Sequence, residues 1–218
     1  MKKLIAIFST LFFIISTSAR ADLGVGISAN FASIDTDGSE TELTGDLQKA
    51  TASHSNDVTI PEIFAEAISD NGFAIGLAYI PARELGSKSR TDTQPTADDD
   101  NDAGTYTAKA EVKNVIQIYT DIPIGPIYAK LGATRATLKT QEKSPNGGAD
   151  FENADVNGYS YGVGYKNDLP FLLPNGYFKV EYTHTNFDEY SDISAKGDRK
   201  VVADTEIDSL RISLGTKF

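Results

Sequence analysis

The sequence predicts an all-β protein, an eight-stranded antiparallel up-and-down transmembrane β-barrel, on three observations. Apolar residues recur at every second position in four segments, and four further segments are compatible with strands. A period of two places alternate side chains on opposite faces of a strand. The connections between the eight segments alternate between long and short without exception. In an antiparallel meander this alternation gathers all the long connections at one end and all the short turns at the other.

The first 21 residues predict a signal peptide that is removed before folding. Lys2 and Lys3 precede an apolar run over 4–15, and the small-residue sequence Ala19-Arg20-Ala21 follows as a cleavage site. The run is far shorter than the roughly 20 residues that a membrane helix needs. We therefore expect a signal peptide over 1–21, cut after Ala21, and a barrel domain over 22–218. Loss of three basic residues takes the net charge from −11 to −14.

Four segments alternate cleanly and are predicted strands. In 23–31 the odd positions are apolar and the even positions hold Gly, Ser and Asn. The segments 73–79, 159–165 and 210–218 repeat this pattern. Four less regular strands are expected over 58–69, 106–120, 126–138 and 177–187. The segment 58–69 also fits a short helix with Pro61 in its first turn; as a strand, it should hold Pro61 near one end.

The connections fit the same architecture. The three short ones are Asp70-Asn71-Gly72, 121–125 and 167–176, and they carry the Asn, Gly and Pro residues typical of tight turns. The long ones cover about 34–57, 82–105, 139–156 and 188–205 and are polar. We expect them to form acidic, solvated loops at the outer end of the barrel.

The charged residues decide between a soluble and a membrane barrel. A soluble barrel fills its interior with large apolar side chains, whereas here the face opposite the apolar one carries charges in mid-strand. We therefore expect the apolar face to contact lipid and the charged face to line the lumen. Opposite charges should pair there, because an unpaired buried charge is costly. The expected luminal charge network is Glu62, Glu66, Lys109, Glu111, Lys113, Lys130, Lys179, Glu181 and Arg211.

The mature chain resembles the small eight-stranded outer-membrane barrels of the OmpA/OmpX type and the related porin-like outer membrane protein β-barrel domain of Gram-negative bacteria. The most specific residues are Leu210, Ile212, Leu214 and the terminal Phe218, which look like the family's C-terminal insertion signal. Thr216 departs from that pattern, which prefers an apolar or aromatic residue there. The resemblance implies residence in the bacterial outer membrane, contact with its lipid and lipopolysaccharide, and recognition by the barrel-insertion machinery.

Composition excludes several function classes. A negative net charge disfavours nucleic-acid binding, and the absence of Cys excludes a thiolate metal site and a Cys nucleophile. The acidic run 98–102 resembles a calcium loop, but Ala103 and Lys109 replace the Gly and Glu of an EF-hand. Loose binding of divalent cations by the acidic loops stays open. We expect no cofactor, no metal site and a monomer, because a closed barrel leaves no sheet edge to pair.

The function expected from these features is that of an integral outer-membrane protein with a structural or surface role and a largely plugged polar lumen. A narrow porin for ions or small solutes is one alternative. A lipid-modifying enzyme at the barrel rim is a less favoured one, for which His184 and the sequence Ser53-His54-Ser55 are the candidates. We expect no enzymatic activity, since His184 lacks a serine at the spacing found in lipid A deacylase barrels.

Overall fold

The computed structural model describes residues 21–43, 49–92, 104–143, 151–170, 174–195, 197 and 199–218. The predicted signal peptide and its Ala19 lie outside these residues, and Ala21 is the first residue of a strand. No helix in the described part of the chain is long and apolar enough to cross a membrane, a finding that does not bear on crossing by strands.

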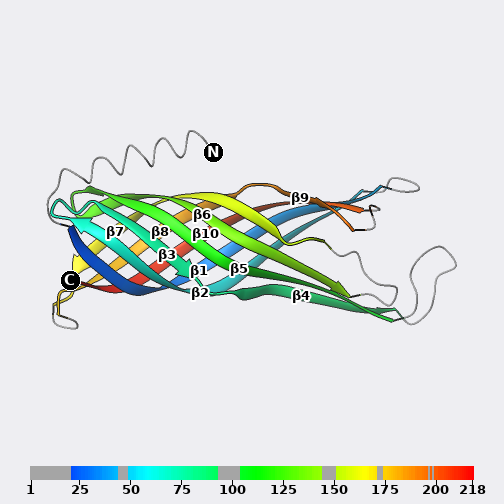
Figure 1. Ribbon diagram of the computed structural model, residues 1–218, viewed down its shortest axis with the longest axis horizontal. Coiled ribbons are helices and arrows are strands. Elements are labelled where there is room, and N and C mark those ends of the chain that lie inside the picture. Colours follow the sequence, from blue (N-terminus) through cyan, green and yellow to red (C-terminus); the bar gives the residue numbers. More distant parts are fainter. Residues whose placement is uncertain are drawn as a thin grey trace.

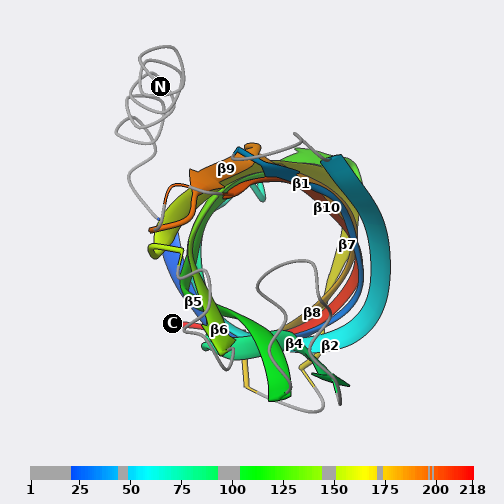
Figure 2. The same ribbon diagram turned by 90° about the vertical axis from the view of Figure 1, so that its right-hand side faces the viewer.

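The described chain forms a closed antiparallel barrel (Figures 1 and 2). Each strand pairs with its neighbour in the order β1–β2–β3–β5–β6–β7–β8–β10, and β10 pairs back with β1. This confirms the predicted eight-stranded all-β fold. Two more strands extend it, β4 beside β5 and β9 beside β10. The strands are β1 (Ala21–Glu42), β2 (Lys49–Ser69), β3 (Ala74–Ile80), β4 (Arg83–Asp92), β5 (Gly104–Ile124), β6 (Ile127–Lys143), β7 (Ala154–Asp168), β8 (Gly176–Phe187), β9 (Tyr190–Ile193) and β10 (Arg199–Lys217).

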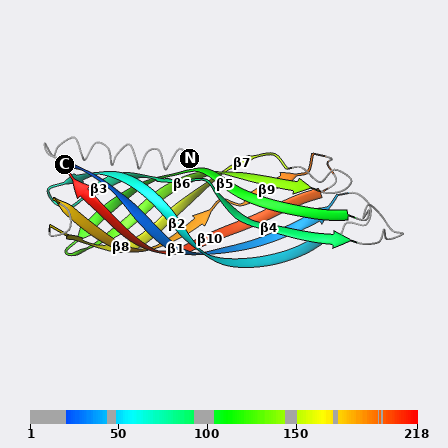
Figure 3. The ribbon, with the colours of Figure 1, turned by 90° about the horizontal axis from the view of Figure 1, so that it is seen from below.

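The two ends of the barrel differ as the connection lengths predict. The turns between β2 and β3 and between β5 and β6 are short and lie at the end that holds Phe218 (Figure 1). Much of the sequence expected to form long loops is instead strand, because β1, β2, β5, β6 and β10 continue well past the apolar segments. Their Thr- and Ser-rich sequences satisfy backbone hydrogen bonds by pairing. Figure 3 shows these strands crossing the barrel obliquely and running far beyond one end.

The outer and inner faces have opposite chemistry. Large aliphatic and aromatic side chains point outward around the whole ring, as Ile27 does with 63% of its surface exposed. Polar and charged side chains point inward, and Lys179 and Glu181 are each 1% exposed. This inversion of the usual soluble pattern suits a wall that contacts lipid outside and encloses polar groups inside.

Pro61 lies in the middle of β2, so the expectation that it would stand near a strand end is wrong. β2 pairs with β1 along nearly its whole length, but it pairs with β3 only from Ile63 to Ile68. The pair farthest from the short turns joins Ile63 to Tyr79. Pro61 lies just beyond that pair. Its missing N–H therefore costs no hydrogen bond with β3, and the segment forms a strand rather than the alternative helix.

A β-bulge in β5 overturns part of the predicted luminal network. Ile116 pairs with Arg135, whereas Lys113 pairs with Thr137, so β5 has one extra residue at this point. Asn114 takes the left-handed conformation there, with φ of 52°. A one-residue slip moves the following side chains to the opposite face. Lys113 thereby shares the outer face of Arg135 and Thr137 and does not reach the lumen.

Glu111 lies beside Lys113 on the same outer face of β5. Glu111 pairs with Lys139, forms a 3.4 Å ion pair with Lys113, and has a side chain that is 34% exposed. Lys109 pairs with Gln141 still further out on β5. The uninterrupted alternation assumed for 106–120 was therefore wrong, because periodicity alone does not reveal a bulge.

Candidate functional site

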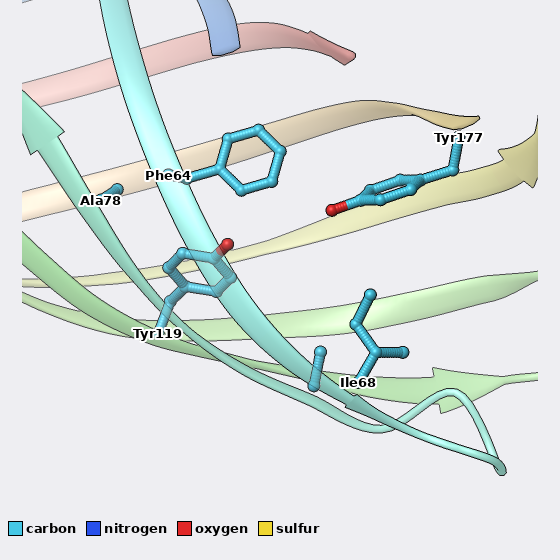
Figure 4. Close-up of a cluster of buried hydrophobic side chains, with 6 residues drawn as sticks. Phe64, Ile68, Ala78, Tyr119 and Tyr177 are labelled. Carbon is cyan, nitrogen blue, oxygen red and sulfur yellow. The ribbon is translucent and has the colours of Figure 1, made fainter. Parts of the chain in front are cut away.

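Four aromatic rings pack inside the lumen and are called the aromatic floor here. Each ring lies over a glycine on the neighbouring strand. The pairs in direct register are Gly26 with Phe64, Gly76 with Tyr119, Gly164 with Tyr128, and Gly215 with Tyr177. A Cβ atom built on any of these glycines would collide with the ring opposite it. Glycine is thus required because the ring occupies the place of a side chain. Figure 4 shows Phe64, Tyr119 and Tyr177 converging inside the barrel with Ile68 and Ala78.

Lys179 of β8 is the centre of a charge network that lies among these rings, with its Nζ 5.2 Å from the centroid of the Tyr119 ring and 5.3 Å from that of Tyr128. Its Nζ lies 2.9 Å from Glu66 of β2, 2.6 Å from Asp121 of β5 and 3.8 Å from Glu181. The Tyr119 hydroxyl donates a further hydrogen bond of 2.8 Å to Glu66. One ammonium group therefore links the three strands β2, β5 and β8 across the lumen.

Lys130 of β6 extends the network around the ring. Its Nζ lies 3.1 Å from Asp121 and 2.8 Å from Glu181, and it stands 3.5 Å from the centroid of the Tyr119 ring. A cation over an aromatic face gains attraction from the ring electrons. The floor and the charge network are thus in direct contact.

Arg211 of β10 forms the upper layer. Its guanidinium lies 3.1 Å from Glu62 and donates hydrogen bonds to Asn30 at 2.6 Å and to Gln117 at 3.3 Å. Gln117 in turn donates to Thr134 and to Ser160. Side chains from β1, β2, β5, β6, β7 and β10 therefore meet at this level.

The network is charge-balanced among the described residues. The buried carboxylates Glu62, Glu66, Asp121 and Glu181 face the buried cations Lys130, Lys179 and Arg211, and Lys166 joins from the rim at 3.3 Å from Glu66. Balance matters because an uncompensated charge in such a setting costs several kcal/mol, on the order of 3–5. The arrangement can hold a lumen closed and rigid, and the described residues contain no group of three or more His, Cys, Asp or Glu side chains that could hold a metal ion.

Six of the nine residues predicted for the luminal network meet in it: Glu62, Glu66, Lys130, Lys179, Glu181 and Arg211. Asp121 is a central member, although the predicted short connection 121–125 places it in a turn. β5 in fact continues to Ile124, and Asp121 follows Gln117 and Tyr119 on the same inward face. Extending the alternation by one step would have identified it.

The rim candidate His184 lies on the outer face, whereas His54 follows Glu62 and Ile60 along the inward face of β2. His184 Nδ1 is 2.9 Å from Asp208 Oδ1, and the Tyr182 hydroxyl donates to the same oxygen. The Tyr161 ring lies against His184, with 5.3 Å between ring centroids. No serine hydroxyl is within hydrogen-bond distance of His184 in the described structure. His54 is exposed on β2, opposite Thr36 and far from this cluster.

The residues of the expected insertion signal form the apolar outer face of the last strand. Leu210, Ile212 and Leu214 point outward, and Phe218 exchanges backbone hydrogen bonds with Leu23 of β1. The terminal residue is thus part of the seam that closes the ring. Recognition of these residues during insertion stays a prediction.

The outward-facing apolar side chains form a ring around the barrel, which we call the apolar band. A charge pair outside this band contrasts with those in the lumen. Arg135 and Thr137 donate hydrogen bonds to Asp155 on the outer face, and the Arg135 hydrogen bond holds the pKa of that carboxyl below its usual value. The Asp155 side chain is 47% exposed. Such a pair contributes little to stability because solvent screens it.

No protein-family model and no curated protein matches this sequence. Among solved structures, the chain is similar to Neisserial surface protein A, with 15% identity and a TM-score of 0.39 over 90% of this chain and 97% of that one. It is similar to the outer membrane protease OmpT from Escherichia coli, with 11% identity and a TM-score of 0.44 over 93% and 98% of the two chains. The attachment invasion locus protein Ail of Yersinia pestis gives 13% identity and a TM-score of 0.31, covering 86% and 97%.

These neighbours are a surface protein, a protease and an attachment protein. At such low identity none of them assigns an activity to this chain. The function has to be sought in the side chains of the barrel itself.

Proposed function

We propose that this protein is an integral outer-membrane barrel with a structural or surface role, whose lumen is closed by its own side chains. The observation that carries the proposal is the balanced charge network on its aromatic floor. Buried ion pairs of this kind hold their members in fixed positions. The apolar outer wall supplies the contact with membrane lipid, and lipopolysaccharide is the expected neighbour at the outer leaflet.

Single-channel recording of the refolded chain 22–218 in a planar bilayer tests this proposal. We expect inserted wild-type barrels to show no discrete openings, because ion pairs and rings occupy the path. The double variant Glu66→Ala/Lys179→Ala removes one carboxylate and one ammonium together and should admit ions. Heat-modifiable migration on a gel confirms in each case that the barrel is folded. Reproducible wild-type openings would instead establish the narrow porin.

A catalytic role at the rim is the second candidate, and the hydrogen bond between His184 and Asp208 is what favours it. A His held by a carboxylate is a common arrangement for a general base, but a nucleophile is also needed. We expect His184→Gln to leave the lipid A and phospholipid composition of the outer membrane unchanged when analysed by mass spectrometry. A modified lipid species that disappears in this variant and in Asp208→Asn would establish the enzyme.

A further inference from the structure

β2 and β4 border an opening in the barrel wall beyond the apolar band. Outward of the pair between Ile63 and Tyr79, the described residues of β2 pair with β1 alone. β4 pairs with β5 alone. Both strands therefore present one free edge, and they do so on neighbouring parts of the wall (Figures 1 and 2). A free edge of backbone N–H and C=O groups is a template for another strand.

The direction of the free backbone groups on β2 follows from two hydrogen bonds. The carbonyl of Thr59 accepts a 2.9 Å hydrogen bond from Arg83 on the β4 side, and the carbonyl of Ile60 accepts one from Asn30 of β1. Successive residues of a strand point their backbone groups to opposite sides. The odd-numbered residues from Thr51 to Asp57 thus face the opening. Pro61, also odd-numbered, protects this edge where it enters the apolar band.

The two edges belong to sheets of opposite charge. We call β9, β10, β1 and β2 beyond the band the acidic sheet (33–42, 49–58, 190–193 and 199–208), and β4, β5 and β6 beyond the band the basic sheet (83–92, 104–113 and 134–143). The acidic sheet has nine acidic and three basic residues, and the basic sheet has four acidic and eight basic residues. Among the acidic residues, Asp35 pairs directly with Glu206, and Asp37 with Asp204. Like charges directly opposite each other repel, so this sheet gains from a cationic neighbour.

We propose that a second copy of this chain occupies the opening, with β2 of each copy paired to β4 of the other. β2 runs toward the apolar band and β4 runs away from it, so the two strands are antiparallel. A two-fold axis along the membrane normal leaves the direction of each strand relative to the membrane unchanged. It places β2 of each copy beside β4 of the other, so that the dimer contains two such strand pairs. Each acidic sheet then meets a basic sheet, and a two-fold interface closes on itself.

The membrane supports this choice of partner, and the proposal rests on the outer-membrane placement above. Two copies embedded in one bilayer sit at the same depth, so their β2 and β4 edges stand at the same height. The hydrogen bond from Arg83 to Thr59 shows that the two edges are level within one chain. A closed ring of strands has no free edge, which is why a monomer is expected from the ring. The parts of β2 and β4 that extend beyond the ring do have free edges.

Cross-linking in outer membranes tests the dimer, because the chain has no Cys of its own. One tagged copy carries Ser53→Cys on β2, and a second, differently tagged copy carries Ser89→Cys on β4. We expect a mild oxidant to produce a covalent dimer containing both tags. The matched control replaces Ser53→Cys by Ser191→Cys, on β9 at the far edge of the acidic sheet, and should give none.

A proline variant tests the edge itself. Adding Ser55→Pro to the β2 copy removes an N–H that faces the opening and leaves pairing with β1 intact, as Pro61 already does in this strand. We expect cross-linking to fall to the level of the control pair. Equal yields from both pairs, no cross-link in a folded and inserted barrel, or an adduct with a different protein would overturn the dimer. Recovery of the chain outside the outer-membrane fraction would instead contradict the proposed function.

Discussion

Replacing Lys179 by Met should destabilise the barrel by about 3–5 kcal/mol, the usual cost of removing one partner from a buried ion pair. The variant leaves Glu66 and Asp121 without the ammonium that lies within 3 Å of each of them. Met has a similar length and no charge, so the loss isolates the electrostatic contribution. Urea titration of the purified barrel in detergent, followed by the heat-modifiable shift on a gel, measures the change.

Lys217 provides the matched control for this prediction. It forms a 2.9 Å ion pair with Asp168 at the rim, and the carboxylate there is largely exposed. Lys217→Met should change stability by no more than about 1 kcal/mol, since solvent screens such pairs. Equal effects at Lys179 and Lys217 would show that the luminal network does not hold the barrel together.

The variant Gly76→Val should prevent the barrel from folding or destabilise it by about 3 kcal/mol or more. Its side chain would occupy the position of the Tyr119 ring, which also donates a hydrogen bond to Glu66. Overpacking of a filled interior forces side chains off their preferred rotamers and shifts the backbone. The yield of heat-modifiable protein after refolding into detergent is the measurement.

Two comparisons make the Gly76 result specific. Gly38→Ala should be tolerated, because a Cβ there meets nothing nearer than the carbonyl of Val202 at 3.6 Å. Gly164→Val should fail as Gly76→Val does, and Tyr128→Ala in the same chain should restore folding by removing the opposing ring. Normal folding of Gly164→Val alone would mean that the rings move aside and do not define the floor.

Strand periodicity predicted the barrel because an apolar side chain returns to the outward face at every second residue of a strand. It identified Lys130, Lys179 and Arg211 as inward for the same reason. It failed at Asn114, where one extra residue changes the face of Lys113 and Glu111. A bulge is set by the pairing of two strands, and no pattern within one strand contains it.

The sequence also does not show how far the strands extend. Beyond the apolar band both faces contact water, so no alternation marks β1 after Phe31 or β2 before Val58. Pairing there depends on the partner strand, as Asp35 and Glu206 show by pairing despite their like charges. The free edges of β2 and β4 follow from which strands pair, which a single sequence does not specify.

The seam between β1 and β10 governs when this protein can fold. Gly24 of β1 pairs with Lys217 of β10, so the ring cannot close until β10 has been synthesised. Contacts this distant in sequence form slowly, since a long loop must close first. Until β10 is synthesised, the edges of β1 and β8 that it joins stay unpaired. A delay before β10 is synthesised therefore lengthens the time during which the incomplete barrel can aggregate through these edges.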